Sequence, residues 1–328
     1  MDKEPIVSVS HLSKVFTSGT GRKKSSLAAV DDISLDIYRR ETLGLMGESG
    51  CGKSTFGRTV LRLIEPTAGS IRFEGTDITH VNMKPYRKEM QIVFQDPMGS
   101  LDPRMKIQDV IYEGIDAAGK LPKEERKKRL LELIEKVGLS AEIAERYPGE
   151  LSGGQQQRIG IARALAVRPK FLVLDEAVSA LDISYQAQII NLLMDIQKED
   201  GLTYLFISHD FSAVRSISDR ICIMYLGKVM ELGKTEDIVK EPFHPYTRLL
   251  MSSILYPEVS DEEEELFVED RQEGVLVRPE KGCRFANRCP YATDICLEKE
   301  PELTEIKPSH FCACFHTGET TKKCASND

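Results

Sequence analysis

The chain has 328 residues, which suits two domains or one large domain with an appendage. Hydrophobic residues make up 41% of it, and 52 acidic residues against 44 basic ones give a net charge of −8, which disfavours nucleic acid as the main partner. No apolar run reaches the roughly 18 residues that a membrane span needs, and residues 1–5 show no signal-peptide pattern. We therefore expect a cytoplasmic chain unless a partner holds it at a membrane.

The first part of the chain predicts a nucleotide-binding loop. Residues 6–35 predict short strands, and residues 42–46 predict a buried strand that leads directly into Gly47-Glu48-Ser49-Gly50-Cys51-Gly52-Lys53-Ser54 and then a helix. Glycines let backbone N–H groups approach phosphate oxygens, and the helix N-terminus adds a favourable dipole. Lys53 can reach the β- and γ-phosphates, and the Ser54 hydroxyl can ligate Mg²⁺. The residues assigned to ATP here are Gly47, Ser49, Gly50, Cys51, Gly52, Lys53, Ser54 and Thr55.

Three further buried strands, at residues 91–94, 171–175 and 203–208, each end in polar side chains. Gln95 follows the first, Asp175 and Glu176 close the second, and His209 follows the third. In a parallel sheet these strand ends lie on the same edge as the phosphate loop. Asp175 is placed to hold Mg²⁺ with Ser54 and Gln95, and Glu176 can polarise an attacking water. We assign catalytic roles to Glu176, His209 and Gln95.

Residues 106–167 read as a helical, highly charged insertion, because strands alternate with helices on either side of them and indicate a parallel α/β core. Inside it, a second Gly-rich run precedes a helix and reads Leu151-Ser152-Gly153-Gly154-Gln155. A hydroxyl and bare N–H groups at a helix N-terminus form a second anion site. One chain does not need two such sites for one nucleotide, so a second subunit could close over the first subunit's phosphates.

The composition changes after Gly233, where proline, acidic residues and cysteine increase. We place a domain boundary there, giving residues 1–240 and 241–328, with an acidic linker around residues 261–265. Six of the eight cysteines lie beyond Lys281, which favours a metal site over disulfides in a cytosolic chain. The spacing C-x5-C-x6-C-x17-C fits no common zinc finger, and thiolates favour an iron–sulfur cluster, with zinc or no metal as alternatives. It joins Cys283, Cys289, Cys296 and Cys314, with Cys312 as an alternative fourth ligand. We interpret Cys222 as a core residue and Cys324 as a free thiol.

The motifs of residues 6–240, in their order along the chain, resemble those of the ATP-binding subunit of an ABC transporter. They are the phosphate loop, Gln95, the run at residues 151–155, the strand ending in Asp175-Glu176, Ser179-Ala180-Leu181-Asp182, and His209. The resemblance implies a P-loop core with a mixed sheet and flanking helices, a helical insertion and an antiparallel β subdomain. It also implies two ATP molecules held head to tail between two subunits. By this resemblance Ser152, Gly153, Gly154 and Gln155 would grip the partner's nucleotide, Asp182 would lie at the seam, and Phe16, or Tyr38 nearby, would stack on adenine.

The C-terminal part resembles the extension of oligopeptide and dipeptide importer ATPases, beginning at Phe243-His244-Pro245-Tyr246-Thr247-Arg248-Leu249-Leu250. That family carries the four-cysteine pattern, and some members hold a [4Fe–4S] cluster there. Residues 95–104 look more like the second of the two ATPase types in heterodimeric peptide importers. The resemblance implies a non-identical ATPase partner, two membrane permease subunits, an extracytoplasmic solute-binding protein, and a place at the cytoplasmic face of the membrane. The alternatives are an importer of nickel or another small solute, a soluble ABC ATPase acting on nucleic acid or ribosomes, and a redox sensor that uses the cysteines.

Overall fold

The computed structural model describes residues 4–19, 25–179, 182–255, 279 and 281–317. The acidic run at residues 261–265, the pair Ala180-Leu181 and Cys324 lie outside these ranges. No helix within them is long and apolar enough to cross a bilayer.

The larger sheet carries the strands that the sequence predicts to be buried. Within the described residues its strand order is β11-β12-β10-β9-β3-β8-β7-β6. Strands β6, β7, β8, β3 and β9 run parallel, and β10, β12 and β11 continue the sheet in antiparallel pairs, so the sheet is mixed, as expected. Their bounds are β3 (Thr42–Met46), β6 (Met90–Val93), β7 (Phe171–Asp175), β8 (Thr203–Ser208), β9 (Arg220–Tyr225), β10 (Lys228–Lys234), β11 (Thr304–Lys307) and β12 (His310–Cys312).

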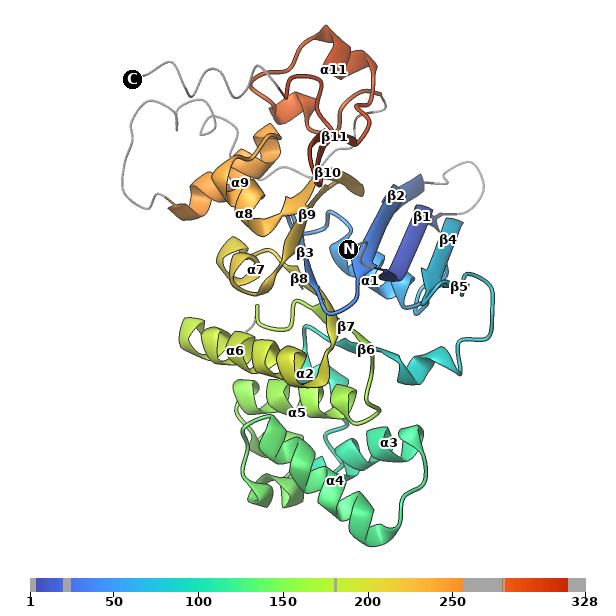
Figure 1. Ribbon diagram of the computed structural model, residues 1–328, viewed down its shortest axis with the longest axis vertical. Helices are drawn as coiled ribbons and strands as arrows, with labels where there is room; N and C mark the ends of the chain where they lie inside the picture. Colours follow the sequence, from blue (N-terminus) through green and yellow to red (C-terminus); the bar gives the residue numbers. More distant parts are fainter. Residues whose placement is uncertain (1–3, 20–24, 180–181, 256–278, 280, 318–328) are drawn as a thin grey trace.

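Layers cover both faces of this sheet, which is why β3, β7 and β8 are buried along their whole length and mostly apolar. Helices α6 (Ile183–Asp200) and α7 (Phe211–Ile217) lie on one face, and α1 (Lys53–Val60) lies on the other (Figure 1). The buried apolar side chains accordingly form two clusters. Helix α1 ends earlier than its apolar pattern suggests, because Arg62 takes a left-handed backbone conformation with φ 53°, and Leu63 beyond it is exposed.

A second, antiparallel sheet stands beside α1 and has the strand order β2-β1-β4-β5. The short strands expected at residues 6–35 are instead two strands of 14 residues each. Register shifts between β1 and β2 near Leu12 break the alternation of buried and exposed side chains, so one long strand resembles several short ones in the sequence. The bounds are β1 (Pro5–Ser18), β2 (Ser25–Tyr38), β4 (Ala68–Phe73) and β5 (Thr76–Asp77).

The helical insertion forms a separate layer at the far end of the molecule from α9 and α11 (Figure 1). Helix α3 buries Ile107, Val110, Ile111 and Ile115, a spacing that places them on one helical face. This face packs into the same core cluster as Leu133 of α4 and Ile159 of α5. The short helix α2 (Pro97–Ser100) precedes the insertion. The insertion comprises α3 (Ile107–Ala118), α4 (Lys123–Lys136), the short turns η3 (Ala141–Glu145) and η4 (Pro148–Glu150), and α5 (Gly153–Leu165).

The cysteine-rich region is joined to the main sheet, which the sequence did not predict. Strand β12 pairs with β10 through Glu231 opposite Cys312 and Leu232 opposite Phe311. The buried Glu231 carboxylate accepts the N–H groups of Phe243 and His244 at 2.9 and 3.0 Å and contacts His310 Nε2 at 2.7 Å. One carboxylate therefore ties three segments together. This region contains α8 (Thr235–Lys240), α9 (Pro245–Leu255), η5 (Ala286–Arg288), α11 (Asp294–Glu298), β11 and β12.

Candidate active site

The phosphate loop runs from the end of β3 into α1, as the sequence predicts. Gly52 has φ 109°, and a Cβ atom there would lie 1.9 Å from the Ala29 carbonyl oxygen, so only glycine fits. Lys53 is buried, and its Nζ donates to the carbonyl oxygens of Gly47 at 2.7 Å and Glu48 at 2.9 Å. A buried ammonium held by neutral carbonyls at a helix N-terminus is well suited to an anionic phosphate group.

Asp175, at the end of β7, lies against the start of α1. The Ser54 hydroxyl donates to Asp175 Oδ1 at 2.6 Å, and the Arg58 Nε and Nη2 groups donate to Oδ2 at 3.2 and 3.1 Å. A hydroxyl beside a carboxylate is the kind of oxygen pair that Mg²⁺ prefers when phosphates and water supply its other ligands. Across the described ranges, no group of three His, Cys, Asp or Glu side chains is placed to hold a metal ion by itself. Arg58 was not among the predicted site residues, although it lies one helical turn after Ser54 and so faces the same side of α1.

Polar side chains from the ends of the two neighbouring strands contact the Glu176 carboxylate. Gln95 Nε2 donates to Glu176 Oε2 at 2.7 Å, and His209 Nδ1 lies 3.7 Å from the same oxygen. Glu176 has a left-handed backbone, φ 51°, and its N–H donates to the Ile207 carbonyl of β8 at 3.0 Å. Such strain in a non-glycine residue persists where the surroundings enforce it, and it clusters at functional sites. The structure therefore brings the three predicted catalytic side chains together beside Asp175.

The second Gly-rich run caps helix α5. Ser152 is the N-cap, with its hydroxyl accepting the Gln155 N–H at 3.4 Å while Gln155 Oε1 accepts the Ser152 N–H at 3.0 Å. Ser152 and Gly153 are exposed. Among the described residues, this run forms no hydrogen bond or ion pair with the phosphate loop of its own chain. The start of α5 is therefore exposed and lies apart from that loop's hydrogen bonds.

The remaining predicted residues lie on β1, on β2 and at the start of α6. Phe16 on β1 is 42% exposed, and Lys14 Nζ lies 5.1 Å from its ring centre. Tyr38, the competing aromatic residue, packs under the Arg220 guanidinium at 5.0 Å. Asp182 is exposed at the N-cap of α6.

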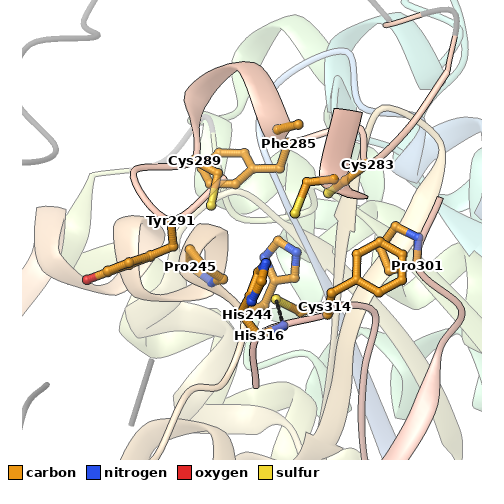
Figure 2. A pocket seen from close by; sticks show the side chains of 12 residues that line it. His244, Pro245, Cys283, Phe285, Cys289, Tyr291, Pro301, Cys314 and His316 are labelled. Carbon is orange, nitrogen blue, oxygen red and sulfur yellow. Dashed lines mark hydrogen bonds between the residues drawn. The ribbon is translucent and has the colours of Figure 1, made fainter. Parts of the chain in front are cut away.

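The cysteines of the extension gather around one pocket. Cys283, Cys289, Cys296 and Cys314 line it together with His244, Phe285 and His316, and Figure 2 shows Cys283, Cys289 and Cys314 around the same space. Cys312 is buried on β12 and is not among the lining residues. Burial raises the pKa of Cys283 to about 11 and that of Cys289 to about 12, so both thiols are neutral at physiological pH. A metal binding here would have to displace their protons.

Two family models match the chain. Residues 30–179 match the model described as "ABC transporter", and residues 230–296 match "Oligopeptide/dipeptide transporter, C-terminal region". The putative oligopeptide transport ATP-binding protein YkfD of Bacillus subtilis is 46% identical, with 98% of this chain and 99% of that protein covered. The oligopeptide transport ATP-binding protein AppF of the same organism is also 46% identical, over 95% of this chain and 98% of that protein.

A solved structure with the same fold is the ATP-binding cassette MJ0796, a dimer in a post-hydrolysis state bound to ADP and Pi. It is 31% identical to this chain and superimposes with a TM-score of 0.63, covering 70% of this chain and 98% of its own. The fold, the site at the sheet edge and the two matched regions agree, and the chain belongs to the oligopeptide/dipeptide importer family of ABC transporter ATP-binding proteins.

Proposed function

We propose that this chain hydrolyses ATP to power the import of peptides through partner permeases. The observation that carries the proposal is the convergence of Gln95 and His209 on Glu176, next to the Ser54–Asp175 pair at the end of the phosphate loop. Phosphoryl transfer depends mainly on positioning and on charge stabilisation, and this arrangement supplies both.

In the proposed mechanism, Lys53 and the N–H groups of the phosphate loop bind the phosphates. Ser54, Asp175 and Gln95 are the residues that would hold Mg²⁺, which neutralises phosphate charge when it is bound. Glu176 orients the attacking water and accepts its proton, while His209 adds a polar group on the same side. Ser152, Gly153, Gly154 and Gln155 complete the site of the partner ATPase, with Asp182 at the seam and Phe16 against the adenine.

The partners follow from this proposal. The chain pairs with a second, non-identical ATPase subunit and sits at the cytoplasmic face of the membrane on two permease subunits, which an extracytoplasmic binding protein supplies with peptide. The names of YkfD and AppF support oligopeptide as the cargo over nickel, and the match at residues 230–296 favours an importer over an ATPase acting on nucleic acid or ribosomes.

Affinity purification of the tagged chain from native membranes tests the assignment. We expect two permeases and a second ATPase to co-purify in amounts comparable to the chain, and peptide to stimulate hydrolysis by the assembly when its binding protein is present. Recovery of ribosomes or nucleic acid without permeases would contradict the proposal, and stimulation by nickel instead of peptide would change the cargo.

We further propose that the cysteine pocket holds a [4Fe–4S] cluster. Four free thiols line one pocket, which is the ligand number such a cluster takes. A bound cluster would supply redox chemistry or local rigidity.

Anaerobically purified protein should therefore be brown and contain iron and inorganic sulfide in stoichiometric amounts. The Cys314→Ser variant should lose most of the iron, because Cys314 lines the pocket, whereas Cys312→Ser should retain it, because Cys312 does not. Iron and sulfide analysis of the three proteins decides the matter. A colourless wild-type protein with one zinc per chain would refute the cluster. Loss of iron in Cys312→Ser but not in Cys314→Ser would identify Cys312 as the fourth ligand in place of Cys314.

A further inference from the structure

The extension forms hydrogen bonds with the phosphate loop at Glu48. Arg288 Nη1 donates to Glu48 Oε2 at 2.9 Å, and the Glu48 N–H donates to the Tyr246 hydroxyl at 2.8 Å. Both partners lie in the C-terminal extension, about 200 residues or more from the loop in sequence. The extension therefore holds this residue by its backbone and by its side chain.

The same contact is continuous with the cysteine pocket through packed aromatic rings. Tyr246 lies 4.7 Å from Tyr225 and 5.4 Å from Phe285, measured between ring centres, and Phe285 lies 5.8 Å from His244. Phe285 and His244 also line the cysteine pocket (Figure 2). Burial lowers the pKa of His244 to about 4, so its ring is neutral, and Nδ1 accepts the Tyr246 N–H at 3.1 Å. The pocket and the phosphate loop thus share one rigid cluster.

Arg288 itself is part of the turn that positions two of the pocket thiols. It ends η5, and its N–H donates to the Phe285 carbonyl at 2.9 Å. The next residue is Cys289, whose N–H donates to the Ala286 carbonyl at 3.2 Å, while Ala286 donates to Cys283 at 3.1 Å. Only a few backbone bonds therefore separate the guanidinium from the two residues that carry these sulfurs.

The charge of Glu48 gives this contact an effect on nucleotide binding. A carboxylate in a phosphate-binding loop repels an anionic ligand unless a cation neutralises it. Arg288 and Glu48 are each about one quarter exposed, so solvent screens their interaction only in part. Although burial opposes the charge of the guanidinium, hydrogen bonds to Glu48 and Tyr225 raise the pKa of Arg288, which stays charged.

We propose that Arg288 is a positioning residue of the nucleotide site: by pairing with Glu48 it makes the affinity of the phosphate loop for nucleotide depend on the state of the cysteine pocket. The inference rests on the proposed ATP site but not on any metal in the pocket. Because coupling between two equilibria is reciprocal, bound nucleotide must also shift the equilibrium between the states of the pocket, and we expect this shift to change how readily the pocket thiols react.

A double-mutant cycle with the full chain tests the first claim, that the pairing of Arg288 with Glu48 sets the affinity for nucleotide. Calorimetry with MgATP should give a Kd about tenfold higher for Arg288→Gln than for the wild type, a coupling of ordinary size. In the Glu48→Gln background, the same Arg288→Gln change should have no further effect, because no carboxylate is left to neutralise. Lys307→Gln, which breaks the surface pair of the extension with Glu241 and makes the same change in charge, should leave the Kd unaltered.

Three outcomes would overturn this first claim. They are an unchanged Kd in Arg288→Gln, an equal rise in Kd when Arg288→Gln is made in the Glu48→Gln background, and an equal rise in Kd in Lys307→Gln. The second of these would mean that the extension had merely loosened, and thermal melting of each variant would show this directly. A wild-type chain that fails to bind MgATP would instead refute the proposed function, so the two failures are distinguishable.

Site-resolved alkylation tests the reciprocal claim, that bound nucleotide affects the cysteine pocket. The rate at which Cys289 is alkylated, followed by mass spectrometry of its peptide, should change on addition of MgADP in the wild type and not in Arg288→Gln. Reading Cys289 alone avoids Cys51, which nucleotide would shield directly within the phosphate loop. Equal rates with and without MgADP in the wild type would overturn the coupling.

Discussion

Replacing Glu176 with Gln should leave MgATP binding intact and slow ATP hydrolysis at least about 100-fold, the usual effect of losing a positioned general base. The glutamine amide has nearly the same shape, but it cannot accept a proton from water. Its carbonyl oxygen can still receive the Gln95 amide that now donates to Glu176 Oε2 at 2.7 Å. The strained backbone at φ 51° is held by the bond to Ile207, which the substitution does not touch. The loss should therefore fall on turnover alone.

Phosphate release at saturating ATP, together with calorimetric binding, measures the two quantities separately. Glu74→Gln is a matched control, because it makes the same chemical change in a surface ion pair with Arg39 and Lys170. We expect the control to hydrolyse ATP at the wild-type rate. Turnover close to normal in Glu176→Gln would show that Glu176 is not the general base. Loss of MgATP binding would mean that the substitution had altered the nucleotide site itself.

Replacing Ser152 with Arg should abolish hydrolysis by the paired ATPases while MgATP still binds to the isolated chain. A long cationic side chain at the exposed start of α5 would occupy the place where the partner's phosphates would dock. The substitution also removes an N-cap, which costs about 1 kcal/mol, too little to unfold a domain of this size. In the Glu176→Gln background, ATP should trap the two subunits as a stable pair. Adding Ser152→Arg should prevent this pair from forming.

Light scattering of the pair with and without ATP, and phosphate release by the assembled transporter, provide the readouts. Ser140→Arg is the matched control, because Ser140 is also exposed and precedes a helical turn, η3, in the same helical layer. It should pair and hydrolyse normally. If Ser152→Arg instead abolished MgATP binding by the single chain, Ser152 would serve its own nucleotide and the head-to-tail arrangement would be wrong.

The parts of the fold that could be predicted from sequence are those with a local pattern. The strands at 171–175 and 203–208 contain uninterrupted apolar runs at 171–174 and 204–207, and the structure has β7 and β8 at these residues. Gln95, Glu176 and His209 could be placed together because each lies within two residues of the end of a strand, and parallel strands end at a common edge. The start of α5 was likewise predicted, because the Gly-rich run at residues 151–155 precedes a helical pattern.

The features that could not be predicted depend on residues far apart in the chain. Strand β12 is three residues long, too short to give a periodic pattern, and it forms only by pairing with β10. The contact of Arg288 with Glu48 joins two charged residues that are unremarkable where they stand. The sequence left Cys312 as an alternative to Cys314 for the fourth ligand. Only the packing of the extension places Cys314 on the pocket and Cys312 away from it.

The buried contact between Glu231 and His310 has a consequence for the order in which the protein folds during synthesis. The two residues are 79 positions apart, an interval that a ribosome covers in roughly 4–16 s at about 5–20 residues per second. Until then β10 presents an unpaired edge, and the Glu231 carboxylate lacks the imidazole that it contacts in the finished sheet. Open edges of this kind are templates for aggregation. The nascent ATPase core therefore passes through a vulnerable interval that ends only when the cysteine-rich segment has emerged and closed the sheet.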